Sequence, residues 1–445
     1  MAYGADRTRA GEAGAAQRAH SWSTAPTSRE PAGDRIAAPA DELSTPDPIT
    51  AAELVDIAAR ILGAAGVPEP TAAAVAASLV ESDLVGHDSH GVRRLVPYVG
   101  AVRAGLIDPA AEPRLLRRHG ATAVVDGRHG FGQLAARLAV TEARRLAREH
   151  GVGVVSIGNC NHIGRLGEYV QTLAEADLVG LAFCNVDPNV APYGGRERRL
   201  GTNPLAWAAP RGAGLAPVVV DFATSAVAEG KLALSMARGE RVDAGLLVDP
   251  EGRDSTDPAD FYRGGALLPF GQHKGYGLSV MIEIVGGLLS GAGVSSLPGY
   301  DNTNGTVLIA IDIGAFLPAG EFRERAEEFC RLLAETAPAT PAGSGTPAGS
   351  GGSGTSAGGG AAGAGRVLVP GEKEALTRAA RERDGIVLAA STWRELAQLP
   401  GGPPPPAPAP APPPSPYPPP RGADGAPLPP EEDSDDPAGG ARAPA

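Results

Sequence analysis

The fold class is set by residues 121–157, which read ATAVVDGRHGFGQLAARLAVTEARRLAREHGVGVVSI. Short apolar runs at 121–125 and 152–157 have the length and composition of buried strands. The residues between them, from about Phe131 to Glu149, have the apolar spacing of an amphipathic helix. The stretch therefore predicts a strand, a helix and a second strand, which indicates an α/β protein.

The glycines before this helix raise the question of a dinucleotide-binding turn. Gly130-Phe131-Gly132-Gln133-Leu134-Ala135 has the G-x-G-x-x-A pattern between a strand and a helix. The next strand, however, ends in Ile157-Gly158-Asn159, which offers no carboxylate for the ribose hydroxyls. No repeated strand–helix–strand halves surround the motif either. We therefore interpret the glycines as a turn and a helix start rather than as a Rossmann nucleotide site.

Strands and helices alternate through the rest of the folded region. Further strands are predicted at Leu178–Cys184, 217–221 and 306–311. A capping box, Thr50-Ala51-Ala52-Glu53, opens a helix toward Leu62. Other predicted helices cover 71–85, 275–289, 321–336, 372–383 and 392–399.

Three stretches lack the periodic apolar residues that a packed core needs. Residues 1–47 are rich in Ala, Gly, Ser, Thr and Pro, and residues 401–445 contain runs of proline and then acidic residues. Residues 339–365 are mostly Gly, Ala, Ser, Thr and Pro. We expect a disordered arm at 1–47, a flexible insertion at 339–365 and a disordered Pro-rich tail at 401–445. The catalytic region then covers 48–400.

Composition excludes several classes of protein. The chain has 445 residues and a formal net charge of −12, so binding to nucleic acid through phosphates is not expected. The three cysteines, Cys160, Cys184 and Cys330, are far apart, which argues against a disulfide framework and favours a cytoplasmic setting. The N-terminus lacks the apolar core of a signal peptide, and the apolar segment 276–289 is too short and Gly-rich to span a bilayer. No membrane partner is expected.

The first segment that carries chemistry is Gly86-His87-Asp88-Ser89-His90-Gly91-Val92-Arg93-Arg94-Leu95, directly after a predicted helix. Ser89, His90 and Arg94 bring a hydroxyl, an imidazole and a guanidinium close together in the chain. Arginine can grip a carboxylate with two parallel hydrogen bonds, and histidine exchanges protons near neutral pH. A plain helix C-terminus, with a histidine at the negative end of the dipole, explains the same residues.

A second segment, Gly158-Asn159-Cys160-Asn161-His162-Ile163-Gly164, follows a strongly apolar strand. Active-site residues of α/β folds gather at such strand ends. His162 is therefore a candidate general acid or base. The alternative is a strand-end histidine that is bonded to the backbone.

Three more positions are candidates for ligand contacts. Thr202 lies in Gly201-Thr202-Asn203-Pro204, a rigid turn, and Asp221 ends an apolar strand, where it could orient a histidine or contact a ribose. Lys274 stands between glycines at a predicted helix start, where a bound phosphate or carboxylate would offset the unfavourable dipole. The alternatives are a connector, a helix N-cap and a solvated lysine, and the spacing around Lys274 is not that of a P-loop.

Taken in chain order, six pieces resemble the malate/L-lactate dehydrogenase family, which includes ureidoglycolate and sulfolactate dehydrogenases and Δ1-piperideine-2-carboxylate reductase. The pieces are D-S-H-G-V-R-R-L from Asp88, N-H-I-G from Asn161, G-T-N-P-L-A from Gly201, D-F-A-T-S from Asp221, K-G-Y-G-L from Lys274 and V-P-G-E from Val369. Each piece alone is weak, but six in this order form a specific signal. The resemblance spans about residues 48–399.

The resemblance implies a fold and a reaction. The implied fold is an α/β homodimer whose sheet, with flanking helices, binds NAD or NADP without a Rossmann fold. The implied reaction is reversible hydride transfer between nicotinamide C4 and C2 of a small 2-hydroxy or 2-oxo acid such as malate or lactate. No metal ion is implied.

The resemblance also implies roles for the candidate residues. Ser89, His90 and Asp221 look like a proton relay, and His162 matches the family's proposed proton acceptor. Which histidine is the main base stays open. The implied substrate contacts are Arg94 and Thr202, and the implied cofactor contacts are Ile163, Gly164, Arg165, Leu166, Asp221, Ala223 and Lys274.

Two other functions fit the same residues. One is a cyclic imine reductase using NADPH, in which His90 or His162 would deliver a proton to nitrogen. The other is an idle paralogue that binds partners through its Pro-rich tail, although the intact candidate residues argue against it. The insertion at 339–365 and the long ends are departures from the family, and the insertion could loosen the V-P-G-E segment that follows it.

Overall fold

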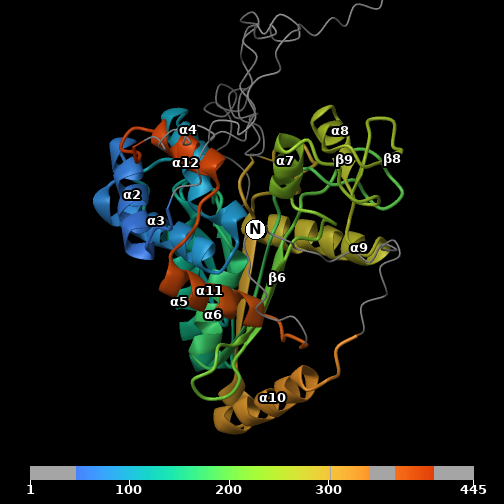
Figure 1. Ribbon diagram of the computed structural model, residues 1–445. Helices are drawn as coiled ribbons and strands as arrows, with labels where there is room; N and C mark the ends of the chain where they lie inside the picture. Colours follow the sequence, from blue (N-terminus) through green and yellow to red (C-terminus); the bar gives the residue numbers. More distant parts are fainter. Residues whose placement is uncertain (1–46, 301, 340–365, 405–445) are drawn as a thin grey trace, which may run out of the picture. The chain divides into compact units, whose positions relative to one another are not determined.

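The computed structural model describes residues 47–300, 302–339 and 366–404, which all belong to the larger of two units of the chain (Figure 1). The predicted arm at 1–47 and insertion at 339–365 lie outside the described residues, apart from Asp47 and Ala339. The tail is described only as far as Pro404. There Pro403 is buried, and the Trp393 Nε1–H donates to the Pro404 carbonyl at 3.1 Å. Contacts of the described chain thus continue to Pro404, and the expected boundary at 400 stays a prediction.

A seven-stranded sheet forms the centre of the unit, in the order β1-β2-β3-β10-β4-β5-β6. Its strands are β1 (Arg114–His119), β2 (Thr122–Asp126), β3 (Val152–Gly158), β4 (Leu178–Cys184), β5 (Leu205–Ala209), β6 (Val218–Phe222) and β10 (Thr306–Asp312). Only β2 and β3 run parallel, and every other neighbouring pair is antiparallel. This mostly antiparallel order confirms a non-Rossmann α/β sheet, since a Rossmann sheet is mostly parallel.

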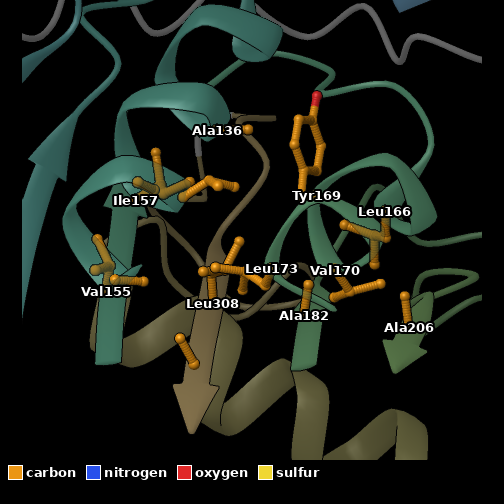
Figure 2. Packing of buried hydrophobic residues seen from close by; sticks show 14 of the residues in the cluster. Ala136, Val155, Ile157, Leu166, Tyr169, Val170, Leu173, Ala182, Ala206 and Leu308 are labelled. Carbon is orange, nitrogen blue, oxygen red and sulfur yellow. The ribbon is translucent and has the colours of Figure 1, made fainter. Parts of the chain in front are cut away.

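The main core lies between one face of this sheet and two helices, α5 (Gly132–His150) and α6 (Leu166–Glu175), which pack side by side (Figure 1). Alternate strand residues point toward these helices, as the two-residue period of a strand requires. Figure 2 shows the contacts, in which Val155, Ile157, Leu308, Ala182 and Ala206 of the strands meet Ala136, Leu166, Tyr169, Val170 and Leu173 of the helices.

A second core joins helices from both ends of the described chain. The helices are α2 (Ala51–Ala64), α3 (Glu69–Leu84), α4 (Leu95–Arg103) and α12 (Ala390–Ala397), and α11 (Glu372–Asp384) packs against α3 without contributing to the core. The predicted capping box is confirmed, because the Thr50 side chain accepts from the Glu53 N–H and the Glu53 carboxylate accepts from the Thr50 N–H. Backbone bonds of 3.0 and 2.8 Å between Ile49 and Ile386 tie the two ends together.

A smaller three-stranded sheet and the remaining helices complete the unit. These elements are α7 (Glu229–Ala237), β7 (Leu247–Val248), β8 (Asp254–Ser255), α8 (Pro258–Tyr262), β9 (Ala266–Leu267), α9 (His273–Ile282), the π-helix η3 (Glu283–Leu288), the 3-10 turn η4 (Ile313–Ala315) and α10 (Ala319–Ala334). The helix predicted at 275–289 is thus α-helical only in part. The π segment begins at Glu283, whose buried carboxylate accepts from the Gly201 and Ser295 N–H groups and from the amide of Asn203. Among the described residues, no helix is both long enough and apolar enough to cross a membrane.

Candidate active site

Two histidines from distant segments meet face to face. His90 lies in the 3-10 turn η1 (Asp88–His90), and His162 lies in the loop after β3. Their rings stack with centroids 5.6 Å apart and planes inclined by 21°. Burial, together with the positive charge of Arg94, lowers the pKa of His162 well below its usual 6.5. Burial and the charges of Arg94, His87, Arg165 and Arg93 lower the pKa of His90 to about 3. Both rings are therefore neutral at pH 7, the state that a proton acceptor needs.

A tyrosine that the sequence analysis missed holds His162. The Tyr98 hydroxyl lies 2.7 Å from His162 Nδ1, and the Gly164 N–H donates to the same nitrogen at 3.3 Å. The Gly164 N–H makes Nδ1 an acceptor in this geometry, whereas the Tyr98 hydroxyl can serve either ring tautomer, because a hydroxyl both donates and accepts. Gln133 Nε2 in turn donates to the Tyr98 hydroxyl at 2.8 Å. Tyr98 stands four residues after Arg94, one helical turn further along the same face, and that spacing is the signal that could have revealed it.

The loop that carries His90 is fixed by a buried carboxylate. Asp83 Oδ2 accepts from the Val92 N–H at 2.8 Å. Gly91 passes so close that a Cβ on it would lie 1.7 Å from Asp83 Oδ1, so only glycine fits there. Burial raises the pKa of Asp83 well above its usual range. Ser89 Oγ lies 3.0 Å from His90 Nδ1, so the first two members of the predicted relay are in contact.

Helix α11, which follows the insertion, also reaches this loop. The Arg381 guanidinium pairs with the Asp88 carboxylate at 2.6 Å and donates to the Asp83 carbonyl. The segment after the insertion is therefore attached directly to the loop of His90.

The G-x-G-x-x-A turn is filled by the loop of His162. A Cβ on Gly132 would lie 2.2 Å from the Asn161 carbonyl oxygen and 2.7 Å from that of His162. The Asn161 side-chain amide donates to the His129 and Gly130 carbonyls at 2.7 and 3.1 Å. These glycines thus let the chain's own backbone approach, where a Rossmann turn would receive a pyrophosphate. The interpretation of the motif as a plain turn agrees with this packing.

Arg94 presents a charge to the histidine pair. It ends the 3-10 turn η2 (Val92–Arg94), and its buried Nε has no hydrogen-bond partner among the described residues. Burial lowers the pKa of Arg94, while nearby Tyr98 and Glu229 oppose this shift. A guanidinium stays protonated in proteins, so the group is a cation with spare donors.

The N-terminus of α6 brings together the predicted cofactor segment and Asp221. Asp221 Oδ2 accepts from the Gly167 N–H at 2.7 Å. Among the described residues no hydrogen bond joins Asp221 to Ser89 or His90, the other two members of the predicted relay. Ile163 and Leu166 are both 2% exposed and belong to the main core, which leaves only their backbone for a ligand.

The other predicted positions lie elsewhere on the unit. The Thr202 carbonyl accepts from the Thr224 N–H at 2.8 Å and from the Thr224 hydroxyl at 3.1 Å, which fixes this turn beside Ala223. Lys274 is exposed in the first turn of α9, and no hydrogen bond or ion pair joins it to the histidine pair within the described part of the chain.

We expect Tyr98→Phe to lower kcat by about 10-fold with little change in KM, since a lost buried hydrogen bond costs on the order of 1 kcal/mol. Steady-state kinetics and thermal unfolding test this. Tyr169→Phe is the matched control, because the Tyr169 hydroxyl donates to the Ile163 carbonyl rather than to a histidine. Equal kinetic effects of the two substitutions would show that Tyr98 is only a packing residue.

Comparison with known proteins places these features in one family. The family description "Malate/L-lactate dehydrogenase" matches residues 49–357. L-sulfolactate dehydrogenase of Methanothermobacter thermautotrophicus is 35% identical over 346 residues, which are 76% of this chain and 92% of that protein. L-lactate dehydrogenase of Cupriavidus necator is 36% identical over 354 residues, 77% of this chain and 94% of the relative. The structure of Δ1-piperideine-2-carboxylate reductase from Pseudomonas syringae has a TM-score of 0.67 and 32% identity, over 80% of this chain and 100% of the other.

Proposed function

Because the chain belongs to the malate/L-lactate dehydrogenase family, we propose that it transfers a hydride between NAD or NADP and C2 of a small 2-hydroxy or 2-oxo acid. The observation that carries this proposal is the stacked pair of neutral histidines beside the Arg94 guanidinium, whose Nε has no partner among the described residues. A hydroxy acid oxidation requires both groups, a proton acceptor for the hydroxyl and a cation for the carboxylate.

The N-terminus of α6 fits a nicotinamide dinucleotide. Gly164 is half-buried with a positive φ of 80° directly before this helix start, and helix N-termini favour phosphate groups. The Asp221 carboxylate at the same place can accept from a ribose hydroxyl. We assign the backbone of 163–166 to the cofactor, and Ala223 and Lys274 to its further contacts. When bound, the cofactor supplies the hydride exchange itself.

Arg94 and His162 divide the work on the substrate. We assign Arg94 to the carboxylate, which it would hold with two parallel hydrogen bonds so that C2 is oriented. In the tautomer whose ring proton lies on Nδ1 and faces the Tyr98 hydroxyl, His162 takes the hydroxyl proton on Nε2 during oxidation and returns it during reduction. The two roles are coupled, because the Arg94 charge helps to lower the pKa of His162. A bound carboxylate offsets that charge, so His162 becomes a stronger base when the substrate arrives. Ser89 and His90 form the alternative relay, and Thr202 is assigned to the substrate side.

We propose that the protein is a homodimer. The sheet face opposite α5 and α6 carries a row of partly exposed apolar side chains in register across five strands, namely Val154, Ile309, Leu181, Trp207 and Val220. Trp207 is 47% exposed. Strands that are apolar on both faces are typical of sheets covered on both sides, and a second copy would cover this one.

We also propose a cytoplasmic location. Cys160, Cys184 and Cys330 are all free and buried in the structure. Free cysteines suit a reducing compartment, where disulfides are rare.

The function is tested by a cofactor-reduction screen of the purified protein. We expect NAD⁺ or NADP⁺ to be reduced with at least one of malate, lactate, ureidoglycolate and sulfolactate, and nicotinamide fluorescence to change on binding. Absence of both signals would contradict the proposal. The reverse reaction is measured with pyruvate, with pyruvate plus an amine, and with a cyclic imine. Much faster reduction of the imine would favour a cyclic imine reductase instead.

A further inference from the structure

Helix α11 presents a polar face to the rest of the unit. Four half-buried residues, Glu374, Thr377, Arg378 and Arg381, follow one another at i, i+3, i+4 and i+7, the spacing of a single helix face. No residue of α11 is fully buried, and its Leu376 is 38% exposed. The helix therefore contributes contacts of polar side chains rather than apolar core.

The backbone on both sides of α11 is fixed to other elements. Before the helix, the Pro370 carbonyl accepts from the Val219 N–H of β6 at 3.2 Å. After the helix, Ile386 exchanges two backbone hydrogen bonds with Ile49. The polar face between these two anchors is thus held beside the C-terminus of α3 and the loop of residues 86–94, which we name the His90 loop.

Arg381 joins α3 to the His90 loop. Its Nη1 lies 2.6 Å from Asp88 Oδ1 and also donates to the Asp83 carbonyl, which belongs to the last turn of α3. Carbonyl groups at a helix C-terminus are favourable partners for an arginine. Because Asp88 opens the 3-10 turn that ends at His90, one nitrogen of Arg381 fixes the start of this turn to the helix before it.

The His90 loop is therefore held from two sides. The Asp83 carboxylate holds its second half through the Val92 N–H, and Arg381 holds its first half. Both residues that the proposed function assigns to the acid on this loop, His90 and Arg94, end the two short turns that these contacts fix. Release of either contact would let the two side chains move relative to the rest of the site.

We propose that Arg381 is a positioning residue that orients the His90 loop, and with it His90 and Arg94, toward the acid substrate. The kinetic part of this inference rests on the proposed function, whereas the order of the loop does not. Arg381 acts through the loop, so its removal should change kcat and KM for the acid. Cofactor affinity should stay constant, because the assigned cofactor segment 163–166 belongs to a different loop.

The test compares the wild type with Arg381→Met, Arg381→Lys and Arg378→Met. Methionine keeps most of the apolar stem and removes the charge, whereas lysine keeps a cation with three donors. Arg378 is the matched control, because it lies one turn earlier on the same face and pairs with Glu81 inside α3, outside the His90 loop. The substrate is whichever of malate, lactate, ureidoglycolate and sulfolactate the wild type oxidises fastest.

We expect Arg381→Met to lower kcat/KM for the acid by about 3–10-fold, between the effect of an exposed ion pair and that of a charge-assisted hydrogen bond. Arg381→Lys should recover most of this loss. Asp88→Asn should act like Arg381→Met, and the double variant should be little worse than either single one, because both remove the same contact. Arg378→Met should change kcat and KM by less than about 2-fold, even where it lowers Tm.

Amide hydrogen exchange reports on the loop without any reaction. In Arg381→Met the amides of residues 87–94, the Val92 N–H among them, should exchange faster than in the wild type. In Arg378→Met faster exchange should be confined to α3 and α11. Nicotinamide fluorescence follows cofactor affinity in every variant.

Two kinetic outcomes would overturn the inference. Unchanged kcat and KM in Arg381→Met, even with a lower Tm, would mark Arg381 as structural only. An equal kinetic loss in Arg378→Met would assign the effect to docking of the whole helix rather than to the contact with Asp88. If the wild type oxidised none of the four acids, the proposed function would fail, and the exchange rates alone would decide. Unchanged exchange at 87–94 in Arg381→Met would then overturn the positioning of the loop.

Discussion

Replacement of His162 by alanine is expected to lower kcat for hydroxy acid oxidation by about 10²–10⁴-fold, the usual contribution of a general base. The reason is the position of the ring, which stacks on His90 and is held at Nδ1 by Tyr98 and the Gly164 N–H. Cofactor affinity should change little, because the side chain lies outside the assigned cofactor segment. Stopped-flow and steady-state kinetics measure the effect, and His162→Gln is the control that keeps polarity without a base.

The pH dependence of kcat/KM tests whether His162 is the base. Because the pKa of His162 is lowered well below 6.5, the acid limb of kcat/KM in the wild type should lie below that pH. The limb should flatten in His162→Ala, and high pH should restore part of the rate as hydroxide replaces the base. Full kcat with an ordinary acid limb would instead move the base to His90, with Ser89 as its partner.

Replacement of Arg94 by alanine is expected to raise KM for the acid substrate by about 30–150-fold, which corresponds to the loss of roughly 2–3 kcal/mol of charge-assisted binding. Cofactor affinity should stay nearly constant. The KM of Arg94→Lys should lie between those of the wild type and Arg94→Ala, because lysine keeps the charge but not the planar fork. Added guanidinium ion should restore part of the activity of the alanine variant but not that of the His162 variant.

The sign of the pH shift separates this prediction from a simple loss of packing. The Arg94 charge is a cause of the lowered pKa of both histidines, although burial is the larger one. Its removal should raise their pKa values, so the acid limb of kcat/KM in Arg94→Ala should move toward higher pH. An unchanged limb together with an unchanged KM would contradict the assigned role.

Sequence patterns predicted the apolar strands well and the exposed ones poorly. The run at Leu178–Cys184 matches β4 at both ends, because a buried strand is almost continuously apolar. In contrast, β1 reads RLLRRH at an exposed edge of the sheet, so its basic residues concealed a strand. Strand β5 and helices α4, α6, α7 and α8 were also missed, and all five are short, at 5 to 10 residues.

For the candidate site, too, some residues could be predicted from the sequence and others could not. The histidine and arginine motifs indicated His90, His162 and Arg94, and the structure brings them together. Tyr98 and Asp83 escaped notice because a tyrosine or an acid within a helix is usually an ordinary packing or surface residue. The contact of Asp221 with Gly167 could not be inferred, since pairing across 54 positions depends on the complete sheet. Roles for Arg165, Thr202 and Lys274 stay predictions.

The place of β10 has a consequence for how this chain is made. The strand joins β3 to β4 at the centre of the sheet, yet it comes about 120 residues after β4, so the sheet stays in two halves until β10 leaves the ribosome. At a typical synthesis rate of 5–20 residues per second, the nascent chain carries both open edges for about 6–24 s. The apolar edges of β3 and β4 are then exposed to other chains. Chaperone demand during synthesis should therefore be high, and nascent chains stalled before Thr306 should aggregate more than the full-length chain.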